Sequence, residues 1–438
     1  MRLKTWAALA AAITLPLLSG CGNDNAQEGE VRVINATTEY ASLDLYTQNS
    51  DGSNNLVVSG TAAGAASAYT GVDRGSYTFD IKSSTGAGTA ATTTGTVTKT
   101  DHFSIVTYLT GGKASATFLT DEEANPASGN AKLRIFNAAT GEAPSVDVYL
   151  STNACDALTV TDTPFASAVT GLQTAYSQLT ANASVTPWNV CVFATGDTTT
   201  LLLDIPALTL KNQEIATLIL THTSGGVLLN GAVLDQQGAM TPYTSTLARV
   251  RVAADATVGS TGGLVTVTIN GSEVSSQAAS PSVGSYVTIP SGTLTTSITV
   301  DGVTTNGVTL PSANAGSDYT LLVTGSQSNP AATLITDDNT PSTSTTQAVK
   351  ARVINGVNGG SGTVSATIDS KTLGNAAFGA ATTYVPLVAT TGTSTVLPTS
   401  VVTTPATLVN QSFTAGEVYT VFIWGNASAP VLTVSSDR

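Results

Sequence analysis

The chain of 438 residues has few charged side chains, and most of those it has are acidic. Lysine and arginine together number 16 against 29 aspartates and glutamates, and charged residues make up 10% of the sequence. Binding to nucleic acid through phosphate contacts needs a basic surface, so this composition argues against nucleic acid as a partner. Threonine, serine, glycine and asparagine are abundant instead, which suits the exposed faces of β-structure.

Histidine is equally scarce, with His102 and His222 as its two occurrences. A serine hydrolase could use one of them, but neither lies near a nucleophile-elbow motif. No cysteine and histidine cluster has the spacing of a zinc site, and no glycine-rich loop precedes a helix in a phosphate-binding pattern. We therefore predict no catalytic residues, no cofactor and no metal, and a hydrolase is the least favoured function.

Large aromatic residues are few as well. A sugar-binding platform needs several exposed aromatic side chains, whereas Trp188 and Trp424 lie in strand-like runs and are predicted to be core residues. A glycan-binding or adhesive protein is therefore an alternative function that the sequence does not favour.

The N-terminus has the pattern of a secretory signal. Arg2 and Lys4 precede an apolar run from Thr5 to Leu18. This run is shorter than the roughly 20 apolar residues that cross a bilayer, and small residues follow it. We predict that residues 1–20 are a signal peptide.

The end of that run, Leu18-Ser19-Gly20-Cys21, resembles the lipobox of bacterial lipoproteins. The resemblance implies that the peptide is cut before Cys21 and that Cys21 carries lipid; the alternative is a plain secretory signal with an incidental cysteine. Two or three acyl chains would hold the protein firmly on a membrane. Because glycine follows Cys21, resemblance to enterobacterial sorting rules favours the outer membrane, on its periplasmic face or at the cell surface. Residues 21–30 are polar and acidic and are predicted to be a lipidated tether.

The remaining cysteines, Cys155 and Cys191, form an even pair in an exported chain. An oxidising compartment favours a disulfide between them, and the alternative is two unrelated buried thiols. The bridge would tie a loose segment around Cys155 to a buried strand around Cys191.

An arginine strand occurs four times in the chain. Its arginines are spaced by 102, 117 and 101 residues: Arg32, Arg134, Arg251 and Arg352. Basic and apolar residues alternate in these strands, which places the basic side chains on one face. That face is either a ligand-facing stripe or, as we favour, a solvated face or a strand edge guarded by charge. Asp44 and Asp147, in the following strands of the first two units, are expected to pair with Arg32 and Arg134 across neighbouring strands.

Units of about 100 residues with many short strands and frequent turn residues are typical of antiparallel sandwiches. We predict an all-β chain of four tandem Ig-like antiparallel β-sandwich domains. Their predicted ranges are 31–121, 131–236, 248–337 and 350–438.

The predicted domain boundaries are acidic connectors. Asp121, Glu122 and Glu123, or Asp337 and Asp338, could ligate calcium and stiffen a junction, but a solvated acidic linker is favoured.

The arginine strand Val31–Ala36, followed by an alternating strand that contains Asp44 and Tyr46, resembles the domain of unknown function 4397 family. The second unit matches in the same way, and the third and fourth carry Thr266 and Ser365 in place of the aspartate. The resemblance implies no catalytic residues. We therefore expect a non-enzymatic, lipid-anchored cell-envelope protein, a rod of domains held to the membrane through Cys21, whose protein or glycan partner the sequence does not identify.

Overall fold

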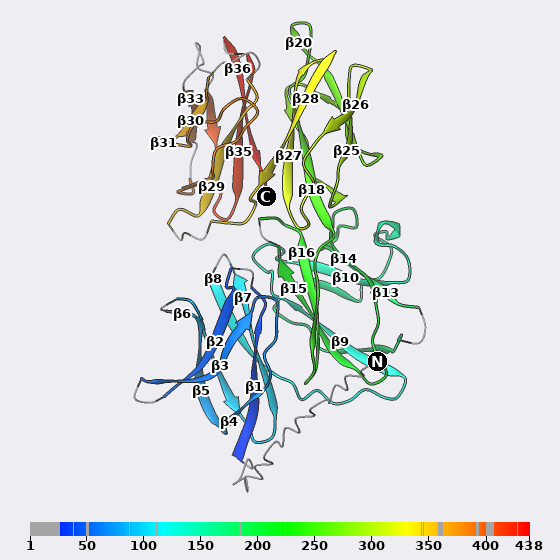
Figure 1. Cartoon of the computed structure of the whole chain (residues 1–438), viewed down its shortest axis with the longest axis vertical. Coiled ribbons are helices and arrows are strands. Elements are labelled where there is room, and N and C mark those ends of the chain that lie inside the picture. The colour runs from blue at the N-terminus through cyan, green and yellow to red at the C-terminus, as the bar shows by residue number, and fades with distance from the viewer. Residues whose placement is uncertain are drawn as a thin grey trace, which may run out of the picture.

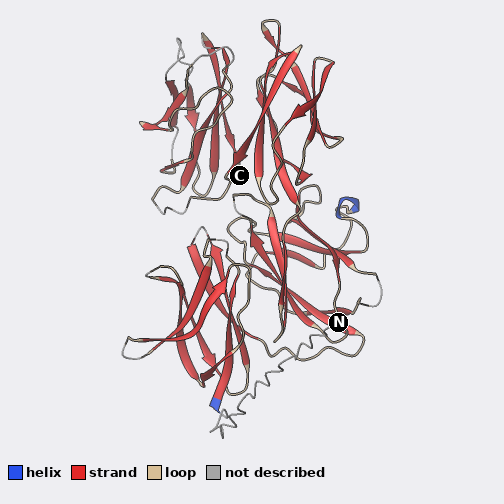
Figure 2. Ribbon diagram, viewed as in Figure 1, coloured by secondary structure: helices blue, strands red, loops and turns tan. Residues whose placement is uncertain are grey.

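The computed structural model describes residues 27–438 with short gaps at 38, 50–51, 87, 111–112, 184–185, 224, 343, 345, 358–361, 391–393, 400–406 and 427. The described chain is built almost entirely from β-strands, and the 3-10 helix η2 (Cys155–Ala157) lies in one of the connections (Figure 2). The predicted all-β class is confirmed. The predicted signal peptide and Cys21 lie outside the described residues.

Repeat 1 consists of two four-stranded sheets, ordered β4-β1-β7-β8 and β3-β2-β5-β6. Its strands are β1 (Glu28–Asn35), β2 (Ser42–Gln48), β3 (Asn54–Ala62), β4 (Thr70–Asp73), β5 (Gly75–Ser83), β6 (Thr89–Val97), β7 (His102–Thr110) and β8 (Lys113–Thr120). The first strand begins at Glu28, inside the range predicted to be tether.

Repeat 2 has the same two sheets, ordered β12-β9-β15-β16-β17 and β11-β10-β13-β14. Its elements are β9 (Asn130–Asn137), β10 (Val146–Ser151), η2 (Cys155–Ala157), β11 (Ala166–Val169), β12 (Ser177–Thr180), β13 (Trp188–Ala194), β14 (Leu201–Leu208), β15 (Ile215–His222), β16 (Leu229–Asp235) and β17 (Met240–Tyr243). The segment predicted to be a linker after residue 236 thus contributes a fifth strand.

Repeat 3 contains a sheet built around β18 and β27 and a second sheet ordered β22-β21-β25-β26. Its strands are β18 (Leu247–Ala254), β19 (Thr257–Val258), β20 (Thr261–Gly262), β21 (Leu264–Ile269), β22 (Ser272–Ala279), β23 (Ser282–Val283), β24 (Val287–Pro290), β25 (Thr295–Val300), β26 (Val303–Thr309), β27 (Asp318–Ser326) and β28 (Asn329–Asp337). Asn270 and Gly271, with φ of 52° and 84°, join β21 to β22 as the tight hairpin that this dipeptide predicts.

Repeat 4 has sheets ordered β32-β29-β35-β36 and β31-β30-β33-β34. Its strands are β29 (Val349–Asn355), β30 (Ser365–Ile368), β31 (Lys371–Thr372), β32 (Val385–Leu387), β33 (Ser394–Thr399), β34 (Leu408–Gln411), β35 (Val418–Asn426) and β36 (Ala429–Ser436).

In every repeat the arginine strand pairs in parallel with a late strand. These pairs are β1 with β7, β9 with β15, β18 with β27, and β29 with β35. We call the sheet that contains this pair the arginine sheet and the other one the outer sheet. Each arginine strand is therefore a central strand of its sheet. The sheets are mainly antiparallel as predicted, but each arginine sheet contains this parallel pair.

The core of each repeat lies between its arginine sheet and its outer sheet. Alternate residues of the arginine strand point into it, as Val31 and Val33 do in repeat 1 and Val250 and Val252 do in repeat 3. The period of two along a strand sends the intervening residues, including the arginine, to the opposite face. That opposite face decides how the repeats pack together.

The four repeats pack as two side-by-side pairs, one pair above the other (Figure 1). Repeats 1 and 2 form the lower pair, and repeats 3 and 4 the upper pair. Apolar residues join each pair: Ile34, Tyr108, Phe136 and Ile219 belong to one cluster between repeats 1 and 2, and Ala253, Leu322, Phe422 and Trp424 to one between repeats 3 and 4. The expected rod of domains is therefore wrong.

Candidate functional site

The four repeat arginines lie inside the molecule. Arg32, Arg251 and Arg352 expose 1–2% of their surface, and Arg134 exposes 7%. Neither interpretation of this face, as a ligand stripe or as a solvated or edge-guarding face, is correct. The neighbouring repeat covers the face, so the alternation of basic and apolar residues marks an internal interface.

Each arginine makes the same first contact within its own repeat. Its Nε donates to a hydroxyl on the residue paired with it in the parallel late strand. The four bonds are Arg32 to Ser104 at 2.8 Å, Arg134 to Thr217 at 2.8 Å, Arg251 to Thr320 at 2.9 Å and Arg352 to Thr420 at 3.2 Å. The parallel pairing thus fixes the side of the guanidinium that faces the sheet. In Arg32, Arg251 and Arg352, Nη atoms then reach groups of the neighbouring repeat.

Three of these hydroxyls donate a hydrogen bond in turn to a buried carboxylate. Ser104 donates to Asp121 at 2.5 Å, Thr320 to Asp337 at 2.7 Å and Thr420 to Asp437 at 2.5 Å. A tyrosine ring covers each arginine, at 4.5–4.7 Å from guanidinium carbon to ring centre: Tyr69, Tyr176, Tyr286 and Tyr384. We call each set of arginine, hydroxyl, tyrosine and, where present, carboxylate an arginine cluster.

In the upper pair the two arginine clusters exchange partners. Arg251 of repeat 3 lies 2.6 Å from the carboxylate of Asp437 in repeat 4, and Arg352 of repeat 4 pairs with Asp337 in repeat 3. Burial disfavours a charged guanidinium, but Asp437, Tyr286 and Asp337 together outweigh this cost and raise the pKa of Arg251. The exchange therefore holds the two repeats in one relative position through buried ion pairs.

Two of the tyrosines, Tyr69 and Tyr286, act as neutral hydrogen-bond donors in these clusters, whereas the buried Tyr384 hydroxyl has no hydrogen-bond partner among the described residues. The Tyr286 hydroxyl donates to Asp337 at 2.6 Å, and the Tyr69 hydroxyl donates to Asp121 at 2.6 Å. Burial and the nearby Asp337 carboxylate raise the pKa of Tyr286 well above its ordinary value. Sequence reasoning missed these tyrosines, although each one immediately precedes a short strand of the arginine sheet in its repeat.

The lower pair is held less symmetrically. Arg32 lies 3.5 Å from Asp121 of its own repeat and donates to the carbonyl oxygen of Gly238 in repeat 2 at 2.6 Å. In repeat 2 the position of the cluster aspartate is taken by Gln236, whose amide bonds to the backbone of Glu123. Arg134 donates to Gln173 at 3.1 Å, and its buried Nη2 has no hydrogen-bond partner among the described residues.

The predicted pairing of Asp44 with Arg32 and of Asp147 with Arg134 is wrong. Asp44 accepts the backbone N–H of Gly60 at 2.8 Å, and Asp147 accepts that of Ala168 at 2.7 Å. Gly60 and Ala168 have positive φ and lie where the strand register shifts, so each aspartate braces a β-bulge.

Repeat 3 carries the same bulge with a different brace. The Thr266 hydroxyl accepts the backbone N–H of Gln277, whose φ is 44°, at 3.0 Å. A threonine oxygen can therefore replace the aspartate, which explains why the acid is absent from that repeat.

The acidic connectors contact basic and imidazole side chains. Glu122 contacts His102 at 2.8 Å, Glu123 pairs with Lys132, and Asp338 lies 2.8 Å from Lys350. Asp121 and Asp337 belong to the arginine clusters. Across the described ranges, no group of three or more histidine, cysteine, aspartate or glutamate side chains is placed to hold a metal ion.

The two histidines also contact glutamates. His102 begins β7 and its ring nitrogen meets Glu122, whereas His222 ends β15, is buried, and has its Nε2 3.5 Å from Glu39 of repeat 1. The described contacts of both histidines thus belong to packing between strands and repeats.

Of the two tryptophans predicted to be core residues, Trp424 is buried, and Trp188 is half-buried and packs on the core of repeat 2.

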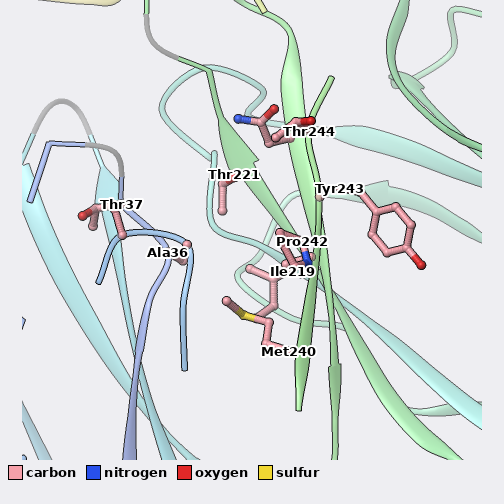
Figure 3. Close-up of a pocket in the computed structure, with 13 residues that line it drawn as sticks. Ala36, Thr37, Ile219, Thr221, Met240, Pro242, Tyr243 and Thr244 are labelled. Atoms are coloured by element: carbon pink, nitrogen blue, oxygen red, sulfur yellow. The ribbon is translucent and has the colours of Figure 1, made fainter. Parts of the chain in front are cut away.

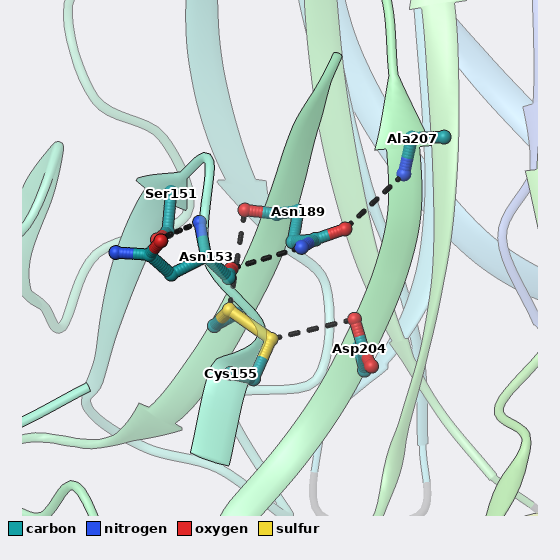
Figure 4. Close-up of a disulfide and its surroundings, with 7 residues drawn as sticks. Ser151, Asn153, Cys155, Asn189, Asp204 and Ala207 are labelled. Carbon is teal, nitrogen blue, oxygen red and sulfur yellow. Dashed lines mark hydrogen bonds between the residues drawn. A yellow bond between two sulfur atoms is a disulfide. The ribbon is translucent and has the colours of Figure 1, made fainter. Parts of the chain in front are cut away.

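Cys155 and Cys191 form the predicted disulfide, with a Cα–Cα distance of 5.5 Å (Figure 4). The bridge holds η2 against β13 on the exposed side of the outer sheet of repeat 2. Tyr149 and Phe193 are buried beneath it with the two cysteines, and Leu158 packs beside them. The extra length of repeat 2 thus folds into a small cap with its own apolar cluster.

A cavity of about 190 Å³ lies between repeats 1 and 2 (Figure 3). Ala63 and Gly64 line it from repeat 1, and Ile219, Met240 and Pro242 line it from repeat 2. Its lining side chains are uncharged and include both apolar residues and polar ones such as Thr37 and Asn230.

Loops connect the lower pair to the upper pair. The Asn339 backbone N–H donates to the Gly225 carbonyl oxygen at 2.9 Å, and Arg438 donates to the Gly141 carbonyl oxygen. A Cβ on Gly226 would lie 2.4 Å from the Gly316 carbonyl oxygen, so this approach requires glycine. In the part of the chain that the structure describes, no helix is long and apolar enough to cross a membrane.

The fold and the arginine clusters define a class of protein: tandem Ig-like β-sandwiches that pack through buried arginine faces. The chain belongs to the family described as domain of unknown function (DUF4397), whose model matches residues 29–149 and 248–357, slightly more than half of the chain. The resemblance seen in the sequence is confirmed. Each matched range covers the first repeat of a pair and extends into the second: the range 29–149 reaches β10, and the range 248–357 ends just after β29.

Among curated proteins, none matches the chain. Solved structures with some likeness include a Bacteroides uniformis protein provisionally named a cell adhesion protein, at 13% identity and a TM-score of 0.22, covering 49% of this chain and 99% of that one. Two repeat units of the collagen binding protein of Staphylococcus aureus have 11% identity and a TM-score of 0.13, covering 93% and 98%. Likeness at these scores carries no conclusion about function.

Proposed function

We propose that the protein is a non-enzymatic, lipid-anchored component of the cell envelope that presents a stiff four-repeat body for structural or interaction roles. The observation that carries this proposal is the exchange of buried ion pairs between Arg251 and Asp437 and between Arg352 and Asp337. The charged side chains of the repeats serve to fasten neighbouring repeats together. A body held in this way suits display of its outer sheets and loops at a fixed geometry.

The anchor in this proposal is lipid on Cys21, after removal of residues 1–20. The short apolar run and the lipobox-like Leu18-Ser19-Gly20-Cys21 support it. The polar segment that follows would separate the body from the membrane, and Gly22 favours the outer membrane, on its periplasmic face or at the cell surface.

The test is the variant Cys21→Ser in cells fed an alkyne-labelled fatty acid. The native chain should incorporate the label and sediment with outer membranes, whereas the variant should take up no label and should leave the outer-membrane fraction. A matched variant, Cys155→Ser with Cys191→Ser, should keep the label. Unlabelled native protein, or normal membrane fractionation of Cys21→Ser, would contradict the proposed anchoring.

A further inference from the structure

Repeat 2 carries a strand that the other repeats lack in the described residues. After β16 the chain turns back and adds β17 to the free edge of the arginine sheet, with Leu234 opposite Met240 and Gly231 opposite Tyr243. The Asp235 backbone N–H donates to Ala239 at 3.0 Å on this edge. The corresponding edge strands β8, β28 and β36 pair on one side only within the described chain.

The edge of β28 matches the edge of β16 residue by residue. In repeat 2, Lys132 pairs with Ile215, and the carbonyl oxygen of Ile215 accepts the N–H of Gln236. In repeat 3, Arg249 pairs with Asp318, and Asp318 pairs in turn with Asp337. Gln236 and Asp337 therefore occupy the same position. The residues covered by β17, 231–234, correspond to 332–335 of β28.

The backbone groups of β28 on this edge are available for pairing. Thr336 corresponds to Asp235. The carbonyl oxygen of Thr336 accepts a hydrogen bond from Arg352 at 2.8 Å, which shows that it points away from β27. Hydrogen-bonding direction alternates along an antiparallel strand, so Leu334 and Ala332 direct their N–H and C=O groups to the same side. Pro330, which has no N–H, marks the end of the usable edge.

An open groove of about 680 Å³ runs beside these residues. Thr333 and Ile335 form one wall, and residues 379–384 of repeat 4 form the other. In the lower pair the equivalent loop of repeat 1 faces β17: Ala65 and Ala380 accept the N–H of Asn35 and Asn355. Figure 3 shows Met240 and Pro242 of β17 across the cavity from repeat 1. The groove at β28 is thus equivalent to the place that β17 occupies in repeat 2, but no strand fills it within the described chain.

We propose that the free edge of β28 binds an extended, uncharged segment of a partner protein, which adds as an antiparallel strand in the manner of β17. Strand addition to an exposed sheet edge is a common mode of peptide recognition. The loop 379–384 walls the far side of the groove, which admits one strand and blocks the sheet edge of a second folded copy. The apolar side chains of Ile335 and Ala381 in the groove favour a segment like that around Met240. The site lies far along the chain from Cys21 and does not depend on how the protein is anchored.

The experiment uses the purified full chain and a fluorescein-labelled peptide with the sequence of residues 238–246, Gly-Ala-Met-Thr-Pro-Tyr-Thr-Ser-Thr. Fluorescence anisotropy should show saturable binding at peptide concentrations below about 1 mM. Ala332→Pro removes one outward N–H donor and should weaken binding at least about tenfold. Ala116→Pro, at the matching position of β8, is the control and should bind as the native chain does.

Thr333→Arg is a second variant that fills the groove from an exposed position without changing the backbone, and it should weaken binding as Ala332→Pro does. No binding by the native chain, or equal binding by the native chain and both β28 variants, would overturn the proposal. An equal loss in Ala116→Pro would do the same. If sedimentation shows that the chain self-associates through an edge that Ala332→Pro blocks, the occupant is a second copy and the proposed partner is wrong.

Discussion

Arg251, in the first strand of repeat 3, lies 2.6 Å from the carboxylate of Asp437, which follows the last strand of repeat 4. The two residues are 186 positions apart along the chain, yet both are buried. Arg352 and Asp337 form the opposite pair across the same interface. Because a buried charge is costly without its partner, this exchange restricts the upper pair to one arrangement of its two sheets.

Arg251 and Arg134 should contribute unequally to stability, and replacing each with methionine should lower the free energy of unfolding by different amounts. Arg251→Met leaves Asp437 buried beside an apolar side chain and should lower the free energy of unfolding by about 3–5 kcal/mol. Arg134→Met removes a guanidinium that forms no ion pair within the described residues and has a buried Nη2 without a hydrogen-bond partner. Its cost should be about 1 kcal/mol. Urea unfolding of the two variants checks this order, and an equal or reversed cost would contradict it.

Asp255, in the interface between repeats 3 and 4, should make the stability depend on pH. Burial raises the pKa of its carboxyl to about 7, against which the Gly425 N–H acts weakly. The folded chain then binds a proton more readily than the unfolded chain between about pH 4 and pH 7. The stability associated with protonated Asp255 is complete below about pH 4 and is lost as the pH rises through 7.

The variant Asp255→Asn should abolish this contribution, because an amide resembles the protonated acid and does not titrate. It should be about as stable as the native chain at pH 4 and more stable by about 2–4 kcal/mol at pH 8. The control is Asp44→Asn, which lies in an outer sheet. The same difference between Asp255→Asn and the native chain at both pH values would refute the raised pKa.

The disulfide should stabilise the cap of repeat 2 locally. Replacing both cysteines, Cys155→Ser with Cys191→Ser, should lower the stability of repeat 2 by about 2–4 kcal/mol. Limited proteolysis should then cut first in residues 156–165, which the bridge holds over Tyr149 and Phe193. The native chain should resist cleavage there. Early cleavage of the native chain in that segment, at the rate seen in the variant, would count against this role.

Much of the fold could be predicted from sequence because local patterns determine it. Alternation gave the arginine strand and the strand that follows it, Asn270-Gly271 marked its hairpin, and the even cysteine count indicated the disulfide. These features depend on residues close together or on a simple inventory. The fold class required nothing more.

The interface could not be predicted in the same way because its partners are far apart in sequence. Alternation shows that Arg32 and Arg352 lie on a different face from Val31 and Val353, but water and a neighbouring repeat both satisfy that pattern. Two recurring features could have indicated the interface. One is the aspartate at the end of a repeat, such as Asp337, and the other is the tyrosine before a short strand, such as Tyr384. The sequence predicts a linker over residues 240–243 because proline is typical of connectors, yet an edge strand such as β17 tolerates Pro242.

A double-mutant cycle on Arg251 and Asp437 tests the central claim, that the repeats are fastened through exchanged ion pairs, most directly. The free energy of unfolding is measured for the native chain, Arg251→Met, Asp437→Asn and the double variant, with the fluorescence of Trp424 in the same interface as a probe. We predict a coupling energy of at least about 1.5 kcal/mol. A cycle of Arg251→Met with the distant Asp44→Asn should be additive within about 0.5 kcal/mol. Additivity of the same size for Arg251 and Asp437 would contradict the account.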